Sequence, residues 1–377
     1  MSTFVRIMIF FLCYIPTLVI VVITPYITRK TESFGVTIPE EEQSNSEIKR
    51  IRNSYRKNTL LFGGGLSVVA LILALFGPIE ATYWCLPVGV FLLIFIMFAF
   101  YLKNHRQVKD LKEKMNWMSE KSRVVIVDTS FRNKKVMASP LWFLLYIVVI
   151  AATAAIGFAL YDKIPERMPM HWNIYGEVDR WANKSYKAIL WAPLTQVFLM
   201  ITMVFVYWSI GKSKQVIDPS NPEKSVEQNR KFRYRWSLFT IVMGLVLIIM
   251  FGAMQLLSYG FVKNSWIIVS LPVVSGLGIV IATIILSLTT GQGGSRLRVK
   301  SERKSDGTEE KVEIRDDDKH WKLGMFYYNP DDPAFIVEKR FGIGWTNNWA
   351  RPISWVITIG FIVFIIVFSV ASTILTK

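Results

Sequence analysis

Long unbroken runs of apolar residues alternate with polar segments along the whole chain. Drawn as a helix, each run is about as long as the hydrocarbon core of a bilayer is thick. Changes in polarity place the ends of each run to within about 2–4 residues. Eight runs are therefore predicted to be membrane-spanning helices: Ile7–Ile27, Leu60–Gly77, Tyr83–Leu102, Leu141–Tyr161, Ile189–Ile210, Trp236–Ser258, Trp266–Thr289 and Ile353–Leu375.

The first run differs from a cleaved signal peptide. It is longer than the apolar core of a signal peptide, and no small-residue cleavage site follows it. Only Arg6 precedes the run, whereas Arg29 and Lys30 follow it. This bias predicts an uncleaved first span with its N-terminus outside the cell.

Lysine and arginine are unevenly distributed among the segments between the runs. Of the 44 Lys and Arg residues, 36 lie in four alternating segments, 28–59, 103–140, 211–235 and 290–352. Because positively charged loops are retained in the cytoplasm, these four segments are predicted to be cytoplasmic. The sequence thus predicts an all-α polytopic, multi-pass protein of the cell membrane, with eight transmembrane helices and both termini outside.

Composition restricts the function classes further. A soluble domain of 377 residues rarely has 52% hydrophobic residues arranged without helical or strand periodicity. No basic and aromatic nucleic-acid module is present, so the net charge of +16 predicts anionic lipids rather than nucleic acid as partners. Cys13 and Cys85 lie within spans, which predicts no disulfide framework, and neither a metal nor a cofactor is expected.

The chain is predicted to have five parts and shows no clear internal repeat. These parts are three spans with two cytoplasmic loops (1–140), a two-span unit with an outer loop at 162–188 (141–210), two further spans (211–289), a cytoplasmic hairpin and aromatic segment (290–352) and the last span (353–377). Helix is expected to continue from the third span through Lys103–Lys121. Loop 28–59 is interpreted as a surface connector with a helix at Ser44–Lys57.

Short β-rich runs predict a small β-containing cytoplasmic insertion. Arg296–Lys300 and Lys311–Arg315 flank the turn Ser305-Asp-Gly307, as in a β-hairpin. Arg123–Asp128 is a third run of this kind. We expect one small sheet from these strands; the alternative is a solvated hairpin.

The middles of the predicted spans contain no Asp, Glu, Lys, Arg or His. Ion-coupled transporters and proton pumps usually need such groups at membrane depth. Gln196 and Gln255 are predicted to hydrogen-bond across helices instead. The alternative is a moving seventh helix, broken at Pro272, Gly276 and Gly278.

The predicted outer loop, residues 162–188, is too short to fold away from the bilayer and contains the one histidine of the outer face, His171. A soft metal ion bound by Met168, Met170 and His171 is a weak alternative, because one imidazole and two thioethers are a poor ligand set. We favour a turn held by hydrogen bonds of His171 and Asn173, with aromatic residues at the headgroup level.

The same loop resembles a known pattern. Its residues Pro165, Pro169, His171-Trp172-Asn173, Gly176, Asp179-Arg-Trp181 and Lys184 resemble the motif P-x-H-W-N-x-x-G-x-x-D of the SdpI-like domain, a bacterial membrane domain of unknown function. That domain occurs in immunity proteins that protect producer cells from the sporulation-delay toxin. The resemblance implies a shared local fold and a ligand or partner site made of Pro169, His171, Trp172, Asn173, Gly176, Asp179 and Trp181.

A second resemblance lies in residues 320–352, here named the aromatic segment. It resembles a small domain of unknown function with the pattern K-L-G-x-F-Y-x-N-P-x-D-P followed by V-x-K-R-x-G-x-G-W-T-x-N. We expect a packed lid on the cytoplasmic helix ends; the alternative is a ligand site in which Lys339, Arg340 and Arg351 bind anionic headgroups. The candidate residues of the segment are Gly324, Tyr327, Asn329, Pro330, Asp332, Pro333, Lys339, Arg340, Gly342, Gly344, Trp345 and Asn348.

Three functions stay open on the sequence. The first is a non-enzymatic immunity, sensor or signalling factor for a membrane-active peptide or envelope stress, with a peptide toxin outside or a repressor protein inside as its partner. The second is a transporter or lipid-handling permease. The third is a membrane-embedded hydrolase with His171 and Asp179 as an acid–base pair. We favour the first, because the sequence offers no nucleophile–base pair and no ionisable group at membrane depth.

Overall fold

A computed structural model describes residues 3–117, 135–172, 177–218, 221–260, 265–299 and 316–375. Within these residues, eight helices are long and apolar enough to cross a membrane. The predicted number of long apolar helices is therefore confirmed, and it is consistent with a multi-pass membrane protein.

One span is built from two α-helices, because α2 (Ser46–Asn58) continues through a π-helical turn at Thr59–Gly63 into α3 (Gly64–Phe76). The other seven spans are single helices: α1 (Thr3–Ile27), α4 (Ile79–Lys114), α5 (Leu144–Ala159), α6 (Tyr186–Lys212), α7 (Pro222–Ser258), α8 (Ser265–Thr290) and α9 (Pro352–Leu375).

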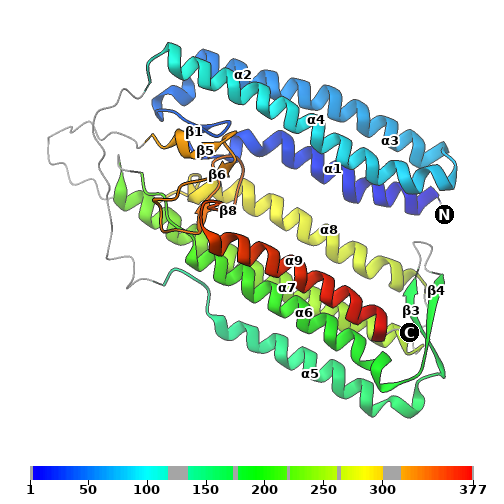
Figure 1. Ribbon diagram of the computed structural model, residues 1–377. Coiled ribbons are helices and arrows are strands. Elements are labelled where there is room, and N and C mark those ends of the chain that lie inside the picture. Colours follow the sequence, from blue (N-terminus) through cyan, green and yellow to red (C-terminus); the bar gives the residue numbers. More distant parts are fainter. Residues whose placement is uncertain are drawn as a thin grey trace.

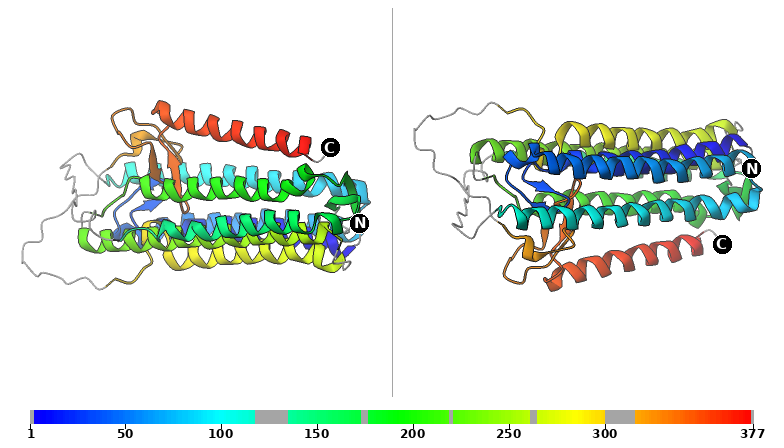
Figure 2. Two further views of the ribbon diagram at one scale, coloured as in Figure 1. Left: turned by 90° about the horizontal axis from the view of Figure 1, so that it is seen from below. Right: turned by 90° about the horizontal axis from the view of Figure 1, so that it is seen from above.

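The helices form two groups that run alongside each other (Figures 1 and 2). In one group α1, α3 and α4 pack on each other, and in the other group α5, α6 and α7 do so. Helix α8 contacts both α1 and α7 and joins the groups, while α9 lies against α6. Both termini lie at the same end of the helices, as an even number of crossings requires (Figure 1).

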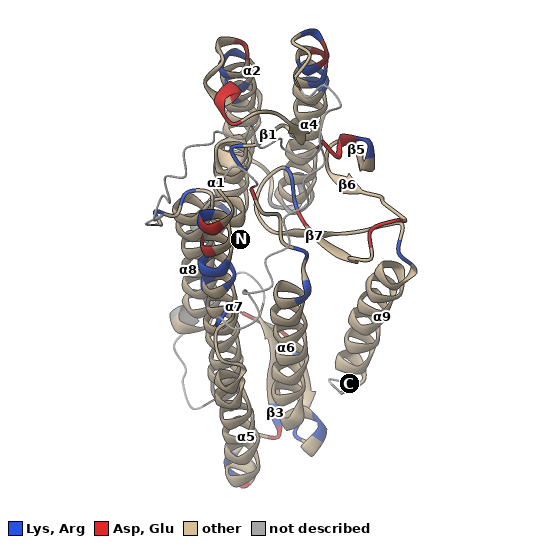
Figure 3. Ribbon diagram, turned by 90° about the vertical axis from the view of Figure 1, so that its left-hand side faces the viewer, with Lys and Arg blue, Asp and Glu red and all other residues tan. Residues whose placement is uncertain are grey.

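The two ends of the molecule differ. The end with both termini also carries the hairpin of β3 (Arg167–Trp172) and β4 (Val178–Asn183), and is named the hairpin end. The opposite end, named the basic end, carries the described parts of the four segments rich in Lys and Arg. Figure 3 views the molecule from the basic end and shows Lys and Arg there on α2 and α4.

Small residues and buried amides hold α5, α6 and α7 together. A Cβ on Gly157 would lie 2.6 Å from Tyr259 Oη, so α5 approaches α7 closely there. Gln196 Nε2 donates to Thr153 Oγ1 (3.0 Å) and to the Ile248 carbonyl oxygen (2.8 Å). The prediction that the glutamines bond across helices is confirmed, and such contacts replace the hydrophobic effect between helices in lipid.

The bounds of α4 and α7 and the continuity of α8 bear on the predictions made from the apolar runs. Helix α4 continues past the predicted third span to Lys114, but a turn at residues 115–117 ends it before the predicted end at Lys121. Helix α7 begins at Pro222, well before the predicted start at Trp236, because polar residues of its first turns are buried against other parts of the basic end. Helix α8 runs unbroken through Pro272, so the alternative of a broken seventh helix is not observed.

Separate β-hairpins form the described β-structure of the basic end. They pair β1 (Glu32–Ser33) with β2 (Val36–Thr37), β5 (Trp321–Lys322) with β6 (Phe326–Tyr327), and β7 (Ile336–Glu338) with β8 (Trp345–Asn347). The predicted strand at Arg296–Lys300 is wrong over 296–299, which form a turn and irregular chain. There the Leu297 carbonyl oxygen accepts from Gln228 Nε2 rather than from a strand. The predicted strands at 123–128 and 311–315 lie outside the described residues.

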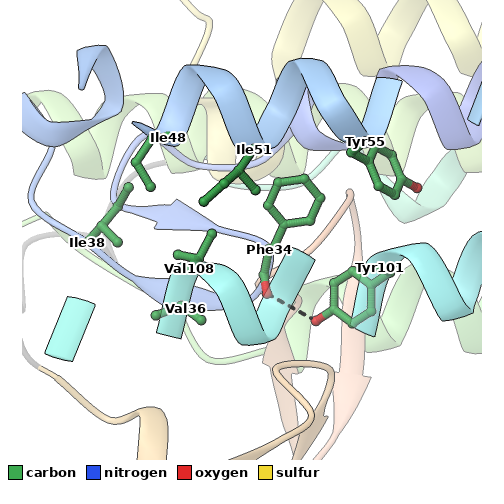
Figure 4. Packing of buried hydrophobic residues seen from close by; sticks show 8 residues of the cluster. All are labelled: Phe34, Val36, Ile38, Ile48, Ile51, Tyr55, Tyr101 and Val108. Carbon is green, nitrogen blue, oxygen red and sulfur yellow. Dashed lines mark hydrogen bonds between the residues drawn. The ribbon is translucent and has the colours of Figure 1, made fainter. Parts of the chain in front are cut away.

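The first part of loop 28–59 is buried at residues 32–38, so its interpretation as a surface connector is wrong there, whereas the helix predicted at Ser44–Lys57 is observed as α2. Its β1–β2 hairpin packs between α2 and α4, where Tyr101 Oη donates to the Phe34 carbonyl oxygen (3.3 Å; Figure 4). Gly35 adopts φ +76° at the turn, in contact with the backbone of Gly324 from the aromatic segment. The apolar cluster comprises Phe34, Val36, Ile38, Ile48, Ile51, Tyr55, Tyr101 and Val108.

Candidate functional site

The β3–β4 hairpin lies across the ends of α6 and α7. Its register shifts between Pro169 and His171, so that Met170 forms a β-bulge. Because of this bulge, three consecutive residues, Met168 to Met170, are buried instead of alternating with exposed ones. The hairpin is thereby fixed to the helix ends by an apolar cluster of Ile164, Met168, Met170, Ala182, Ala188, Ile189 and Tyr259.

His171 and Asp179 form a pair across this hairpin. His171 Nδ1 lies 2.6 Å from Asp179 Oδ1, and the two side chains are 59% and 44% exposed. The hydrogen bond fixes the imidazole and leaves Nε2 available to another partner. In the part of the chain that the structure describes, no group of three or more His, Cys, Asp or Glu residues is placed to hold a metal ion.

A cavity of about 310 Å³ lies beneath the hairpin, between helices of both groups. This volume is at the lower end of the range for small-molecule sites. The walls are mostly apolar and come from four helices and β3, with aromatic or methionine side chains from α1, α6, α7 and β3. The lining residues are Met8 of α1; Pro169, Met170, His171 and Trp172 of β3; Ala188, Trp191 and Ala192 of α6; Phe251, Met254, Gln255 and Ser258 of α7; and Ile268 and Pro272 of α8.

Few polar groups face this apolar surface. Gln255 Nε2 donates to the Ile189 carbonyl oxygen (2.9 Å), whereas its Oε1 is buried and has no hydrogen-bond partner among the described residues. Ser258 Oγ donates to the Gln255 carbonyl oxygen (2.7 Å). Trp191 Nε1 donates to Ser372 Oγ (2.7 Å), which fixes this wall to α9. The site therefore combines an apolar surface, one spare acceptor and the imidazole at its rim.

The aromatic segment at the basic end is held together by Asn348, which is fully buried. Its Nδ2 donates to the carbonyl oxygens of Asn329 (2.8 Å), Asp332 (3.2 Å) and Ala334 (3.0 Å). Its Oδ1 accepts from the backbone N–H of Asn329 (3.0 Å). The Asn348 side chain thus makes with the backbone of residues 329–334 the hydrogen bonds that a neighbouring strand would otherwise make.

The carboxylate of Asp332 connects the segment to the end of α6. It accepts from Lys214 Nζ (2.6 Å), from Tyr327 Oη (2.8 Å) and from the backbone N–H of Ala334 (3.0 Å). The last of these bonds is the turn cap that the sequence Asn329-Pro-Asp-Asp-Pro333 favours.

Gln292, just after α8, connects the segment to a further helix. Its Nε2 donates to the carbonyl oxygens of Lys339 (3.1 Å) and Gly344 (2.9 Å), and its Oε1 accepts from the Gly344 N–H (2.8 Å). Gly344 has φ +112°, a conformation that a glycine adopts without strain.

Buried ion pairs complete the lid. Glu338 contacts both Arg29, which follows α1, and Arg233 of α7. Arg340 pairs with Asp317 and Asp318. Burial by itself would raise the pKa of Asp318, but Arg340 and Lys112 outweigh it and lower that pKa to about 2. Both helix groups are therefore joined through charges removed from water.

Two comparisons with known families bear on these regions. Residues 148–197 match a domain of unknown function (DUF1648). This match covers most of α5, the hairpin and the first part of α6. Residues 330–355 match a family of unknown function (DUF5808), which covers the second part of the aromatic segment and the start of α9. No curated protein and no solved structure matches the chain.

The structure brings part of the predicted outer site together. Pro169, His171 and Trp172 line the cavity, and Asp179 holds His171. Trp181 is 47% exposed, does not line the cavity and has the Arg167 guanidinium over its ring. Asn173 and Gly176 lie outside the described residues.

The candidate residues of the aromatic segment are mostly occupied with packing. Gly324, Tyr327, Asn329, Asp332, Arg340, Gly342 and Asn348 are buried, Gly344 and Trp345 are half-buried, and Pro330, Pro333 and Lys339 are exposed. Arg340 is engaged in ion pairs, so it is not presented to a lipid headgroup as the ligand-site alternative requires. This arrangement is that of a packed lid.

Most of the cavity wall was missed on the sequence. Met8, Trp191 and Met254 look like ordinary residues of apolar runs, and nothing near them in the chain indicates a shared wall. Within the spans, Gln255 and Pro272 are the lining residues that the sequence marks as unusual, whereas the outer-loop motif indicates Pro169, His171 and Trp172.

Proposed function

We propose that the protein is a non-enzymatic membrane receptor that captures an apolar part of a membrane-active peptide, and acts as an immunity or sensor factor against such peptides. The observation that carries the proposal is the cavity beneath the hairpin, where Pro169, His171 and Trp172 cover a pocket shared by four helices. The walls of this pocket are almost entirely apolar, which supports the binding of an apolar ligand.

The proposal places the hairpin end outside the cell. The distribution of Lys and Arg supports this side, since 36 of 44 lie in segments that alternate with the hairpin loop. A peptide that attacks from outside then meets the hairpin first.

The chemistry of the walls favours a peptide as ligand. Met8, Met170 and Met254 provide flexible, polarizable side chains, which adapt to apolar side chains of different shape. The unpartnered Gln255 Oε1 offers an acceptor to a backbone or amide N–H. Transport is less well supported, because α8 is continuous through Pro272 and the basic end carries a packed lid.

A substitution that fills the cavity beneath the hairpin tests this proposal. Ala192 is 2% exposed and lines the wall, so Ala192→Phe occupies the space without altering charge. Ala155→Phe is the matched control, because Ala155 is exposed on α5 and outside the cavity. The probes are cationic amphipathic peptides that permeabilise sensitive bacteria, each with a photoreactive leucine on its apolar face.

The wild type and Ala155→Phe are expected to protect cells and to be cross-linked to the peptide at the hairpin. In Ala192→Phe, both the protection and the cross-linking yield are expected to fall at least tenfold. Equal protection and cross-linking by all three proteins would contradict the proposal. So would the absence of any cross-link across the whole set of active peptides.

The His171–Asp179 hydrogen bond favours a second candidate, a hydrolase that acts at the cavity rim. Peptide cleavage by the purified wild type that is lost in His171→Gln would establish it. Capture without cleavage, retained in part by His171→Gln, agrees with the receptor.

A further inference from the structure

A second hollow, of about 590 Å³, lies at the basic end and is chemically the opposite of the first. Five of its seven lining residues are cations. They come from three separate places in the chain: the segment before α5, the first turns of α7 and the segment after α8. The lining residues are Lys135, Arg230, Lys231, Tyr234, Arg235, Leu297 and Arg298.

Among the residues that the structure describes around the hollow, cations outnumber acids. Glu227 pairs with Arg230 (2.6 Å) and lies 3.7 Å from Lys231. Lys135, Arg235 and Arg298 form no ion pair with any described residue, and all three are exposed. The hollow therefore has a positive charge that a bound anion would neutralise.

The hollow lies at the depth of lipid headgroups. The apolar run of α7 begins at Trp236, directly after Arg235. At the start of the neighbouring span, Leu141 and Trp142 are 69% and 52% exposed, as expected of side chains that enter lipid. Cations at this level face phosphates rather than acyl chains.

The backbone around the hollow is fixed. Arg230 Nη1 donates to the Lys135 carbonyl oxygen (3.2 Å), and Gln228 Nε2 donates to that of Leu297 (2.9 Å). Gly294 adopts φ +83° in direct contact with the Gln228 backbone, which leaves no room for a side chain. The three segments therefore hold their cations together before any ligand arrives.

We propose that this hollow binds the phosphate headgroup of an anionic phospholipid. Arg235, Arg298 and Lys135 contact the phosphate, with the Arg guanidinium groups suited to two-point bonding. Tyr234 and Leu297 lie against the glycerol and the first carbons of the acyl chains. This site is independent of the cavity at the hairpin end and differs from the predicted headgroup site at Lys339, Arg340 and Arg351.

The test uses the full-length protein in detergent and native mass spectrometry with added phosphatidylglycerol or phosphatidylcholine. The variant is Lys135→Gln/Arg235→Gln/Arg298→Gln. The matched control removes the same charge from an open basic surface on α2, as Lys49→Gln/Arg50→Gln/Lys57→Gln. Thermal unfolding checks that both variants stay folded.

The wild type is expected to prefer phosphatidylglycerol, and the hollow variant to lose about 100-fold in affinity, since each Lys or Arg near an anionic surface contributes about 1 kcal/mol. The α2 control is expected to change less than threefold. Equal losses in the two variants, or no preference between the lipids, would overturn the proposal. Full displacement of the lipid by millimolar inorganic phosphate would also overturn it, because the ligand would then be a free anion.

Discussion

Replacement of Asn348 by alanine tests the account of the aromatic segment most directly. The side chain is fully buried and bonds three backbone carbonyl oxygens and the backbone N–H groups of Asn329 and Ala350. Each buried group left without a partner costs about 1–3 kcal/mol. Because neighbouring losses are not additive, we expect a total near 3 kcal/mol, or about a 100-fold rise in the opening equilibrium of the segment.

Hydrogen–deuterium exchange of the β7 and β8 amides measures this opening. Asn347→Ala is the matched control, because Asn347 is half-buried and its Nδ2 donates to Thr358 Oγ1 (3.1 Å) at the start of α9. The control is expected to change exchange by less than tenfold. The same exchange rates in Asn347→Ala and Asn348→Ala would refute the role assigned to Asn348.

Three further predictions concern other regions. Gly157→Ala is expected to destabilise the protein by about 1–3 kcal/mol, since a Cβ there has no room, whereas Gly360→Ala, with nothing nearby, leaves the thermal midpoint unchanged or higher. Burial raises the pKa of Glu32 from 4.5 to about 7, although Arg29 and Arg340 act against it. Its contribution to stability is therefore full below pH 4.5 and is lost as the pH rises through 7; thermal unfolding of Glu32→Gln should lack this decline, and an unchanged pH profile would refute it. Asp179→Ala frees His171 and should weaken protection against peptides at least fivefold. Trp181→Ala should leave protection unchanged, because Trp181 does not line the cavity. Equal effects of the two substitutions would show that protection does not depend on the cavity.

The membrane topology could be predicted because its cause is local. A bilayer of fixed thickness requires long apolar runs, and each run can be recognised from its own residues, without information on the helices that pack against it. The polar start of α7 was missed for the same reason. Arg233 there is 2% exposed, and its burial depends on Glu338, which lies far along the chain.

The sites depend on contacts between distant segments, which hydropathy does not record. Met8 and Pro272 share one cavity although most of the chain separates them. The pair of Arg29 and Glu338 looks, in sequence, like two ordinary charges of basic loops. By contrast, His171 and Asp179 are close in sequence on one hairpin, so their proximity could be proposed in advance.

The order of synthesis gives the shared carboxylate of Glu338 a timing role. Arg29 and Arg233 are synthesised long before Glu338, so neither guanidinium group can pair with this carboxylate until residue 338 has left the ribosome. The carboxylate that neutralises the two guanidinium groups, that of Glu338, lies in the segment directly before the last helix, α9. A nascent chain interrupted before residue 338 would therefore lack both ion pairs by which Glu338 joins α1 and α7.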